Sequence, residues 1–356
     1  MLLVVPRSSG AFLGTSIMPD SRLPLPRRSL LQLGTAACAA VVLGGTARAG
    51  EAAPEAGGTA GLSLKGKTIA ISVAGTDHFF DLKAYQAQIE TVKALGGTPI
   101  GLDAGRSDKT LVSQLQTLVT QKPDAVIQTL GTLSVVDPWL KKLRQAGIPV
   151  FSVDLPSTNV INTATSDNFS LGAQLALQLV SDIGGKGNVV VFNGFSGVPV
   201  CAIRYAELQA VLKYYPEVKI IQPELRDVIP NTVQDAYGQI TALLSKYPDK
   251  GSIAAVWSAW DIPQLGATQA LTAAGRTEVR TYGVDGTPEV LTLVKDPNSP
   301  AAAVAAQQPS EIGRTAVLNL ARYLSGDKGL PSQTFLPAII ANKANAAAVQ
   351  KQLGQA

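Results

Sequence analysis

Residues 68–73, TIAISV, decide the fold. This short run is apolar and rich in β-branched residues, which is typical of a strand buried on both faces of a sheet. Apolar residues with helical spacing follow over residues 82–95, and a second strand-like run covers residues 98–102. Because buried strands that alternate with helices form parallel sheets covered on both faces, this stretch predicts a doubly wound α/β domain.

The alternation continues to residue 153 and starts again at residue 188. Further strands are predicted over residues 125–128, 149–153, 188–192, 218–221, 254–257 and 279–284, and further helices over 109–120, 135–145, 201–214, 233–246, 265–274 and 288–294. Two such arrays in one chain predict two doubly wound parallel-sheet lobes. In sheets of this kind ligands bind outside the carboxyl ends of the strands, so two facing lobes would enclose a cleft.

The N-terminal part of the chain has the pattern of an export signal. Arg27 and Arg28 precede a modest apolar segment and a cleavage motif of small residues. Paired arginines in this position are typical of a twin-arginine signal. The sequence therefore predicts a signal peptide over residues 1–49, a flexible tether over residues 50–64 and a periplasmic protein. An uncleaved membrane anchor is the alternative.

The charge balance argues against nucleic acid as a partner. Residues 1–49 carry a net charge of +4, which equals the formal charge of the whole chain, so the remainder is neutral. Cys201 is the only cysteine after residue 49, which excludes an intramolecular disulfide. His78 is the only histidine, and a lone histidine does not make a metal site. We therefore expect no metal and no cofactor.

Acids, amides and aromatic residues follow the predicted strands, at the edge where a ligand would bind. They are Asp77, Phe79 and Phe80 after the first strand, then Asp154, Trp260, Asp285 and Gln307. An aromatic face covers the C–H surface of a sugar, and carboxylates and amides bind its hydroxyls. Each residue also has a structural alternative, because an aspartate can cap a helix and a phenylalanine can belong to the core.

Motifs of common enzymes are missing from the sequence. Residues 194–197, GFSG, lack the spacing of a nucleophile elbow, and residues 184–187, GGKG, lack that of a phosphate loop. Cys201 has no histidine nearby in the sequence and is predicted to be a packed apolar residue. A glycosidase remains an alternative, because a retaining enzyme needs two carboxyl groups about 5 Å apart and Asp154 and Asp285 could supply them.

Six elements, in chain order, resemble those of ribose-type periplasmic sugar-binding proteins. They are Asp77-His78-Phe79-Phe80, Val150 to Asp154, Ser166-Asp167-Asn168, Trp260-Asp261, Tyr282 to Pro288, and Gln307 with Ile312-Gly313. The similarity extends from about Lys67 to Gly326. It implies a type I periplasmic binding protein fold, in which three strands form a hinge between the lobes and the cleft closes on a solute. We expect the hinge strands near residues 165–166, 307–308 and 330–334. The implied N-terminal lobe covers residues 65–165 and 308–332, and the C-terminal lobe covers residues 166–307 and 333–356.

The resemblance also implies which residues line the cleft. Carried over position by position, they are Asp77, Phe79, Phe80, Asp154, Arg204, Trp260, Asp285 and Gln307. Three positions depart from the family pattern: Leu155 replaces an arginine that grips the ligand, Trp260 replaces an asparagine, and His78 replaces a proline. These departures argue against ribose itself and for a less hydroxylated, differently shaped or larger solute.

The resemblance predicts a monomeric receptor that is not an enzyme. Its small polar solute would be a sugar or a polyol, delivered to an ABC permease in the inner membrane. Two alternatives remain. The closed form could instead be presented to a membrane sensor, or the same architecture could serve an exported carbohydrate-active enzyme.

Overall fold

The computed structural model describes residues 61–355. The predicted signal peptide, and the predicted tether up to residue 60, lie outside the described residues. Leu64 is buried, and its backbone N–H donates to the carbonyl oxygen of Leu95 at 2.8 Å. The prediction of a tether through residue 64 is therefore too long, because Leu64 already packs in the core of the first lobe.

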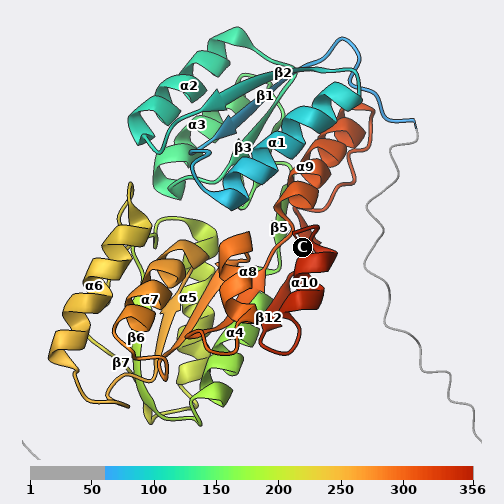
Figure 1. The fold of residues 1–356 in the computed structure, drawn as a ribbon. Helices are drawn as coiled ribbons and strands as arrows, with labels where there is room; N and C mark the ends of the chain where they lie inside the picture. The colour runs from blue at the N-terminus through green and yellow to red at the C-terminus, as the bar shows by residue number, and fades with distance from the viewer. Residues whose placement is uncertain (1–60, 356) are drawn as a thin grey trace, which may run out of the picture. The chain divides into compact units, whose positions relative to one another are not determined.

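The described residues form two α/β lobes, each built on a six-stranded sheet (Figure 1). In spatial order, the first sheet contains β2 (Thr98–Asp103), β1 (Thr68–Val73), β3 (Ala125–Thr129), β4 (Val150–Val153), β5 (Thr163–Ser166) and β11 (Gln333–Leu336). The second sheet contains β7 (Val218–Ile220), β6 (Gly187–Phe192), β8 (Ala255–Ser258), β9 (Arg280–Asp285), β10 (Ala301–Ala306) and β12 (Ile339–Asn342). Only β12 runs antiparallel, to β10. The two sheets share one strand order, which confirms the predicted pair of doubly wound lobes.

Helices cover both faces of each sheet, as expected for buried parallel strands. The first lobe has α1 (Phe79–Ala94), α2 (Asp108–Gln121), α3 (Leu133–Gln145) and α9 (Pro309–Leu324), and the second has α4 (Asn168–Asp182), α5 (Pro199–Leu212), α6 (Thr232–Lys246), α7 (Asp261–Ala273), α8 (Pro288–Lys295) and α10 (Ala346–Gln352). Along β1, Ile69 and Ile71 face the core beneath α1 and α9, whereas Ala70 faces the core beneath α2 and α3. None of the helices within residues 61–355 combines the length and hydropathy that a bilayer crossing requires.

Several elements at the junction of the lobes lack the apolar pattern of the other strands and helices. Strand β5 reads Thr-Ala-Thr-Ser and is fully buried although three of its four residues are polar. It therefore lacks the apolar run that indicates a buried strand. Two of its three hydroxyls are bonded internally, because Thr163 Oγ1 lies 2.8 Å from Ser152 Oγ and Thr165 Oγ1 donates to Asp154 Oδ1 at 2.5 Å. The third, Ser166 Oγ, is buried without a partner among the described residues. The adjacent α4 starts at a cap, where the Asp167 side chain accepts the N–H of Ser170 at 3.0 Å. Helices α9 and α10 and strand β12 were not predicted, whereas β5 and β11 lie close to the hinge strands expected near residues 165–166 and 330–334.

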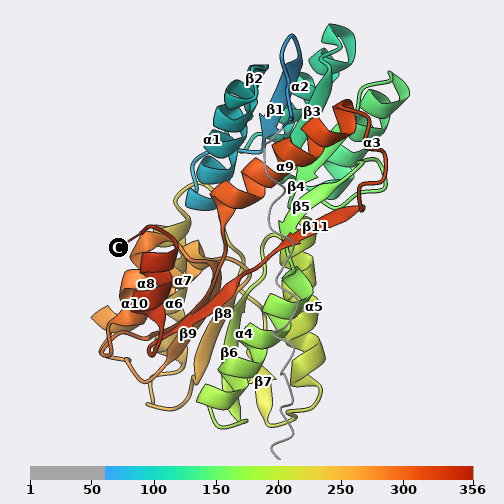
Figure 2. The same cartoon turned by 90° about the vertical axis from the view of Figure 1, so that its right-hand side faces the viewer.

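Three segments connect the lobes. The chain leaves the first sheet after β5, returns to the first lobe between β10 and α9, and leaves it again between β11 and β12. Figure 2 shows β5 and β11 side by side at this junction, where they pair in parallel. The third crossing had been predicted near residues 330–334, with the lobe boundary at residue 333. That position is wrong, because β11 belongs to the first sheet and the crossing falls at Pro337-Ala338.

Candidate functional site

A cavity of about 700 Å³ lies at the carboxyl ends of the strands of both sheets, and we call it the cleft. The first lobe contributes residues that follow β1, β2, β3 and β4. The second lobe contributes residues from the β6–α5 segment, from the loop before α6, and from the ends of β8 and β9. The two walls touch, because Leu133 N–H donates to the carbonyl oxygen of Gly197 at 3.0 Å. The two lobes therefore touch at the edge of the cleft.

Six of the eight predicted site residues line the cleft: Asp77, Phe80, Asp154, Arg204, Trp260 and Asp285. The other two do not. Phe79 is half-buried at the first position of α1. Gln307 is buried behind the wall, where its Nε2 donates to Asp285 Oδ1 at 2.7 Å. Gln307 thus orients a lining carboxylate but does not face the cavity.

The backbone is strained where it meets the cleft. Within residues 61–355, six residues other than glycine have a positive φ. Four of them line the cleft: Arg106 (φ 61°), Leu130 (φ 54°), Asp154 (φ 52°) and Asp285 (φ 124°). Such conformations cost on the order of 1–3 kcal/mol each and cluster at functional sites, where the surrounding structure imposes them. This strain supports a site built to hold these side chains in fixed positions.

Arg204 on α5 is a buried cation between the two lobes. Its Nε donates to Asn168 Oδ1 at 2.7 Å and its Nη1 to the carbonyl oxygen of Ala259 at 2.9 Å. Its Nη2 is buried without a hydrogen-bond partner in the described chain and lies 3.9 Å from Asp154 Oδ2. Nη1 also lies 3.8 Å from Asp285 Oδ1. One donor nitrogen of this guanidinium is therefore available to a guest, because a buried N–H without a partner is unfavourable.

The carboxyl groups around Arg204 are hard to ionise. Burial raises the pKa of Asp154, although the positive charge of Arg204 opposes the shift. Burial raises the pKa of Asp285 well above its usual value, and the neighbouring Asp261 raises it further. Burial also raises the pKa of Asp261 to about 7. These groups can donate as well as accept hydrogen bonds when protonated, which suits a guest with many hydroxyls.

Trp260 belongs to an aromatic cluster that spans the cleft. Its ring centroid lies 4.5 Å from that of His78, in the other lobe, and 5.4 Å from that of Phe195. The indole is 7% exposed, and its Nε1 donates to Asp227, which also accepts the N–H of Gly194 at 3.0 Å. Sequence analysis did not identify Asp227, because nothing in its loop indicates the long-range bond to Trp260.

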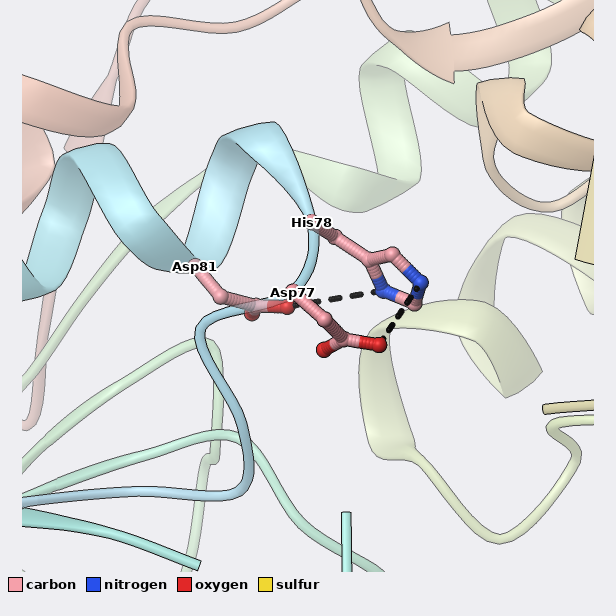
Figure 3. A group of neighbouring side chains, drawn as sticks. All are labelled: Asp77, His78 and Asp81. Carbon is pink, nitrogen blue, oxygen red and sulfur yellow. Dashed lines mark ion pairs between the residues drawn. The ribbon is translucent and has the colours of Figure 1, made fainter. Parts of the chain in front are cut away.

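Asp77, His78 and Asp81 point toward one another at the start of α1 (Figure 3). Their ligand atoms lie close enough to hold a metal ion, and they are the one such group within residues 61–355. A guanidinium occupies the position of the cation. Arg106 donates from Nε to Asp77 Oδ1 at 2.7 Å and from Nη2 to Asp81. The cluster therefore functions as an ion-paired group, and Asp81 and Arg106 are cleft residues that sequence analysis missed.

His78 is neutral at physiological pH in this setting. Its Nδ1 lies 2.7 Å from Arg106 Nη2 and acts as acceptor, because a guanidinium only donates. Burial lowers the pKa of His78 to about 4; the charge of Arg106 also lowers it, and Asp77 opposes both. The structure places His78 in the wall of the first lobe, in contact with Trp260 of the second.

Two further sequence interpretations have clear outcomes. Cys201 is 8% exposed, and burial raises the pKa of its thiol to about 12, so it is a packed apolar residue as predicted. Leu155 is fully buried in the core beneath α2 and α3, and it does not line the cleft. Its side chain therefore does not occupy the position of a ligand-gripping group, because it points into the core.

Comparison with known proteins gives consistent matches. Residues 69–328 match the family model described as "Periplasmic binding protein domain". A solved ABC transporter solute binding protein from Agrobacterium vitis, with bound allitol, is 67% identical with a TM-score of 0.81, covering 82% of this chain and 100% of that one.

Two curated relatives are more distant. The xylitol-binding protein of Mycolicibacterium smegmatis is 29% identical over 202 residues, which cover 54% of each chain. This chain therefore spans about half the length of that relative. The ribose import binding protein of Escherichia coli is 28% identical over 267 residues, 73% of this chain and 86% of the relative. These matches confirm the resemblance to periplasmic sugar-binding proteins.

Proposed function

We infer the function of this chain from its family: it belongs to the periplasmic binding protein domain family, whose model covers residues 69–328. The family implies a location outside the cytoplasm and a role in binding a solute. We propose that the solute is a neutral, acyclic sugar alcohol and that the protein delivers it to an ABC permease. The protein is a monomer in this proposal, and residues 1–49 are its twin-arginine signal.

The observation that carries the proposal is the chemistry of the cleft walls. Both guanidinium groups of the cleft are already close to carboxylates: Arg106 to Asp77 and Asp81, and Arg204 to Asp154 and Asp285. Six aspartates and two arginines line the cleft, and this excess of acids disfavours a phosphate or a carboxylate. A neutral polyol has hydroxyls that both donate and accept, so it matches walls that hold both acids and guanidinium groups. The bound allitol of the Agrobacterium vitis relative has this chemistry.

Binding and closure are linked by this geometry. A solute that bonds Arg204 and Asp285 in one lobe and Asp77 and Asp154 in the other gains all its contacts only when the lobes meet. Such a solute shifts the population toward the closed form, in which both walls face it. A permease can then read the closed surface. The relatives are import and transporter proteins by name, which favours delivery over the sensor alternative.

An enzymatic role has less support. The thiol of Cys201 stays protonated, since its pKa is about 12, and it is therefore a poor nucleophile. Asp154 and Asp285 both lie near the guanidinium of Arg204, where they serve as hydrogen-bonding groups for a guest. We therefore propose that the protein binds and releases its solute unchanged.

Calorimetric titration tests the proposal. The chain without residues 1–49 would be titrated with allitol, xylitol, ribose and allonate, which is the carboxylate counterpart of allitol. We expect the two alditols to bind at least about tenfold more tightly than ribose, and allonate to bind weakest. Failure of every neutral polyol to bind, or preference for allonate, would contradict the proposal. Recovery of unchanged alditol after incubation checks that no turnover occurs.

A further inference from the structure

The loop between β2 and α2 brings an arginine to the cleft that sequence analysis did not identify. Arg106 has a left-handed backbone, with φ at 61°, and its N–H donates to the carbonyl oxygen of Ala74 at 2.7 Å. Its side chain is 18% exposed and lines the cavity. Of the described first-lobe residues that line the cleft, Arg106 is the only arginine or lysine.

The guanidinium of Arg106 is held on one edge. Nε bonds Asp77, and Nη2 bonds both His78 and Asp81. The charges of Asp81 and Asp77 raise the pKa of Arg106 against the opposing effect of burial, so it stays cationic. Nη1 has no hydrogen-bond partner among residues 61–355. A fixed planar group with two unused N–H bonds on its remaining edge is suited to grip hydroxyl oxygens.

A glycine after β1 makes room for this arrangement. A Cβ atom on Gly75 would lie 2.9 Å from Cγ, Cδ and Nε of Arg106, closer than real side chains approach. The stem of Arg106 therefore lies across the backbone at Gly75. The segment after β1 thus gives Arg106 its space at Gly75 and its acceptors at Asp77, His78 and Asp81.

We propose that Arg106 is a specificity-determining residue that donates from Nη1 to one particular hydroxyl of the solute. The proposal rests on the proposed function and deepens it. The position after β4, where the resemblance implied a gripping arginine, holds Leu155, whose side chain lies in the core. Arg106 supplies a guanidinium to the same wall from a different strand end. The solute is accordingly selected on the first-lobe side by a hydroxyl positioned to meet this guanidinium.

Paired changes in protein and ligand test this contact. Allitol and its mono-deoxy derivatives would be titrated against the wild type and against Arg106→Gln. We expect Arg106→Gln to weaken allitol binding about 10- to 100-fold, as for a lost hydrogen bond to a charged group. The deoxy derivative that lacks the contacted hydroxyl should bind the wild type more weakly than allitol does. For Arg106→Gln, this derivative and allitol should have the same dissociation constant, because the variant has already lost the contact.

The controls separate a contact from a structural role. Arg144→Gln removes an exposed arginine at the end of α3 and should leave every dissociation constant unchanged. Because Arg106→Gln also leaves Asp81 without its cation, the double variant Asp81→Asn/Arg106→Gln keeps the pair neutral and should show the same loss of hydroxyl selectivity.

Two results would overturn the inference, and they are distinguishable. If each deoxy derivative binds more weakly than allitol by the same factor in the wild type and in Arg106→Gln, Arg106 does not contact the solute. The proposed function then stands. If the wild type binds no alditol at all, the proposed function fails and this inference fails with it.

Discussion

The two walls of the cleft each present one arginine, but the two arginines are satisfied to different degrees. In the first lobe, Arg106 is 18% exposed and bonded to Asp77, His78 and Asp81. In the second lobe, the side chain of Arg204 is 3% exposed, and its Nη2 is buried without a bond, 3.9 Å from Asp154. The first wall is therefore assembled in advance, whereas the second is incomplete until a guest enters. A buried donor without a partner is costly, so we expect Arg204 to contribute more to binding than Arg106.

Loss of the buried arginine should have the largest effect. Arg204→Gln is expected to weaken allitol binding about 100-fold or more, because it removes a desolvated charged donor that faces both lobes. Calorimetric titration measures the change. Arg276→Gln is a matched control, since Arg276 is 6% exposed and bonds backbone carbonyls near Pro248 outside the cleft. The control should lower the melting temperature without changing affinity. A dissociation constant for Arg204→Gln within about threefold of wild type would contradict the expectation that Arg204 contributes more to binding than Arg106.

Loss of the aromatic face should have an intermediate effect. Trp260→Ala is expected to weaken alditol binding by about 1–3 kcal/mol, the range for a buried aromatic contact. Trp139→Ala is the control, because Trp139 on α3 is half-buried, stacks with Lys142 and does not line the cleft. Equal affinities for Trp260→Ala and wild type would remove the indole from the site and leave the polar walls alone responsible for binding.

The residues at the carboxyl ends of the strands could be predicted from the sequence. Asp154 and Asp285 end apolar strands, so the rule that ligands bind at carboxyl ends places both at the cleft. The doubly wound lobes follow from the same alternation of strands and helices. Strand β5 lies where a hinge strand was expected, near residues 165–166, but its buried Thr and Ser side chains leave no apolar pattern from which its bounds could be predicted.

The parts of the site that escaped prediction depend on long-range pairing. Arg106 lies 25 residues from Asp81, and Asp227 lies 33 residues from Trp260. Neither pair has a local pattern, because the partners meet only when separate strand ends converge. Gln307 was misplaced for the opposite reason: its position after β10 suggested the cavity, but its side chain is buried against Asp285.

The smallest effect should come from the titration of His78 in the first wall. Its pKa is about 4 in the folded protein, against 6.5 for an unperturbed histidine. Between these values the unfolded chain binds more protons, so this residue makes the free energy of unfolding fall as pH falls from 7 to 5. Asp81 opposes the trend, because its raised pKa of about 6 lets the folded protein take up a proton in the same range.

Comparing His78→Gln with wild type isolates the imidazole, since the chain has no other histidine. Lowering the pH from 7 to 5 should cost the wild type on the order of 1 kcal/mol more than the variant, or about 2–4 °C in melting temperature. Calorimetric melting at both pH values measures this difference. A variant that loses as much stability as the wild type would contradict a neutral His78 in the first wall.

The central claim is that a polyol holds two preformed lobes together. Small-angle X-ray scattering measures it directly, as the radius of gyration of the chain without residues 1–49 before and after addition of saturating allitol. We expect the radius to fall on addition of allitol to the wild type and to stay constant for Arg204→Gln. An unchanged radius in the wild type, at an allitol concentration that calorimetry shows to be saturating, would contradict closure around the guest.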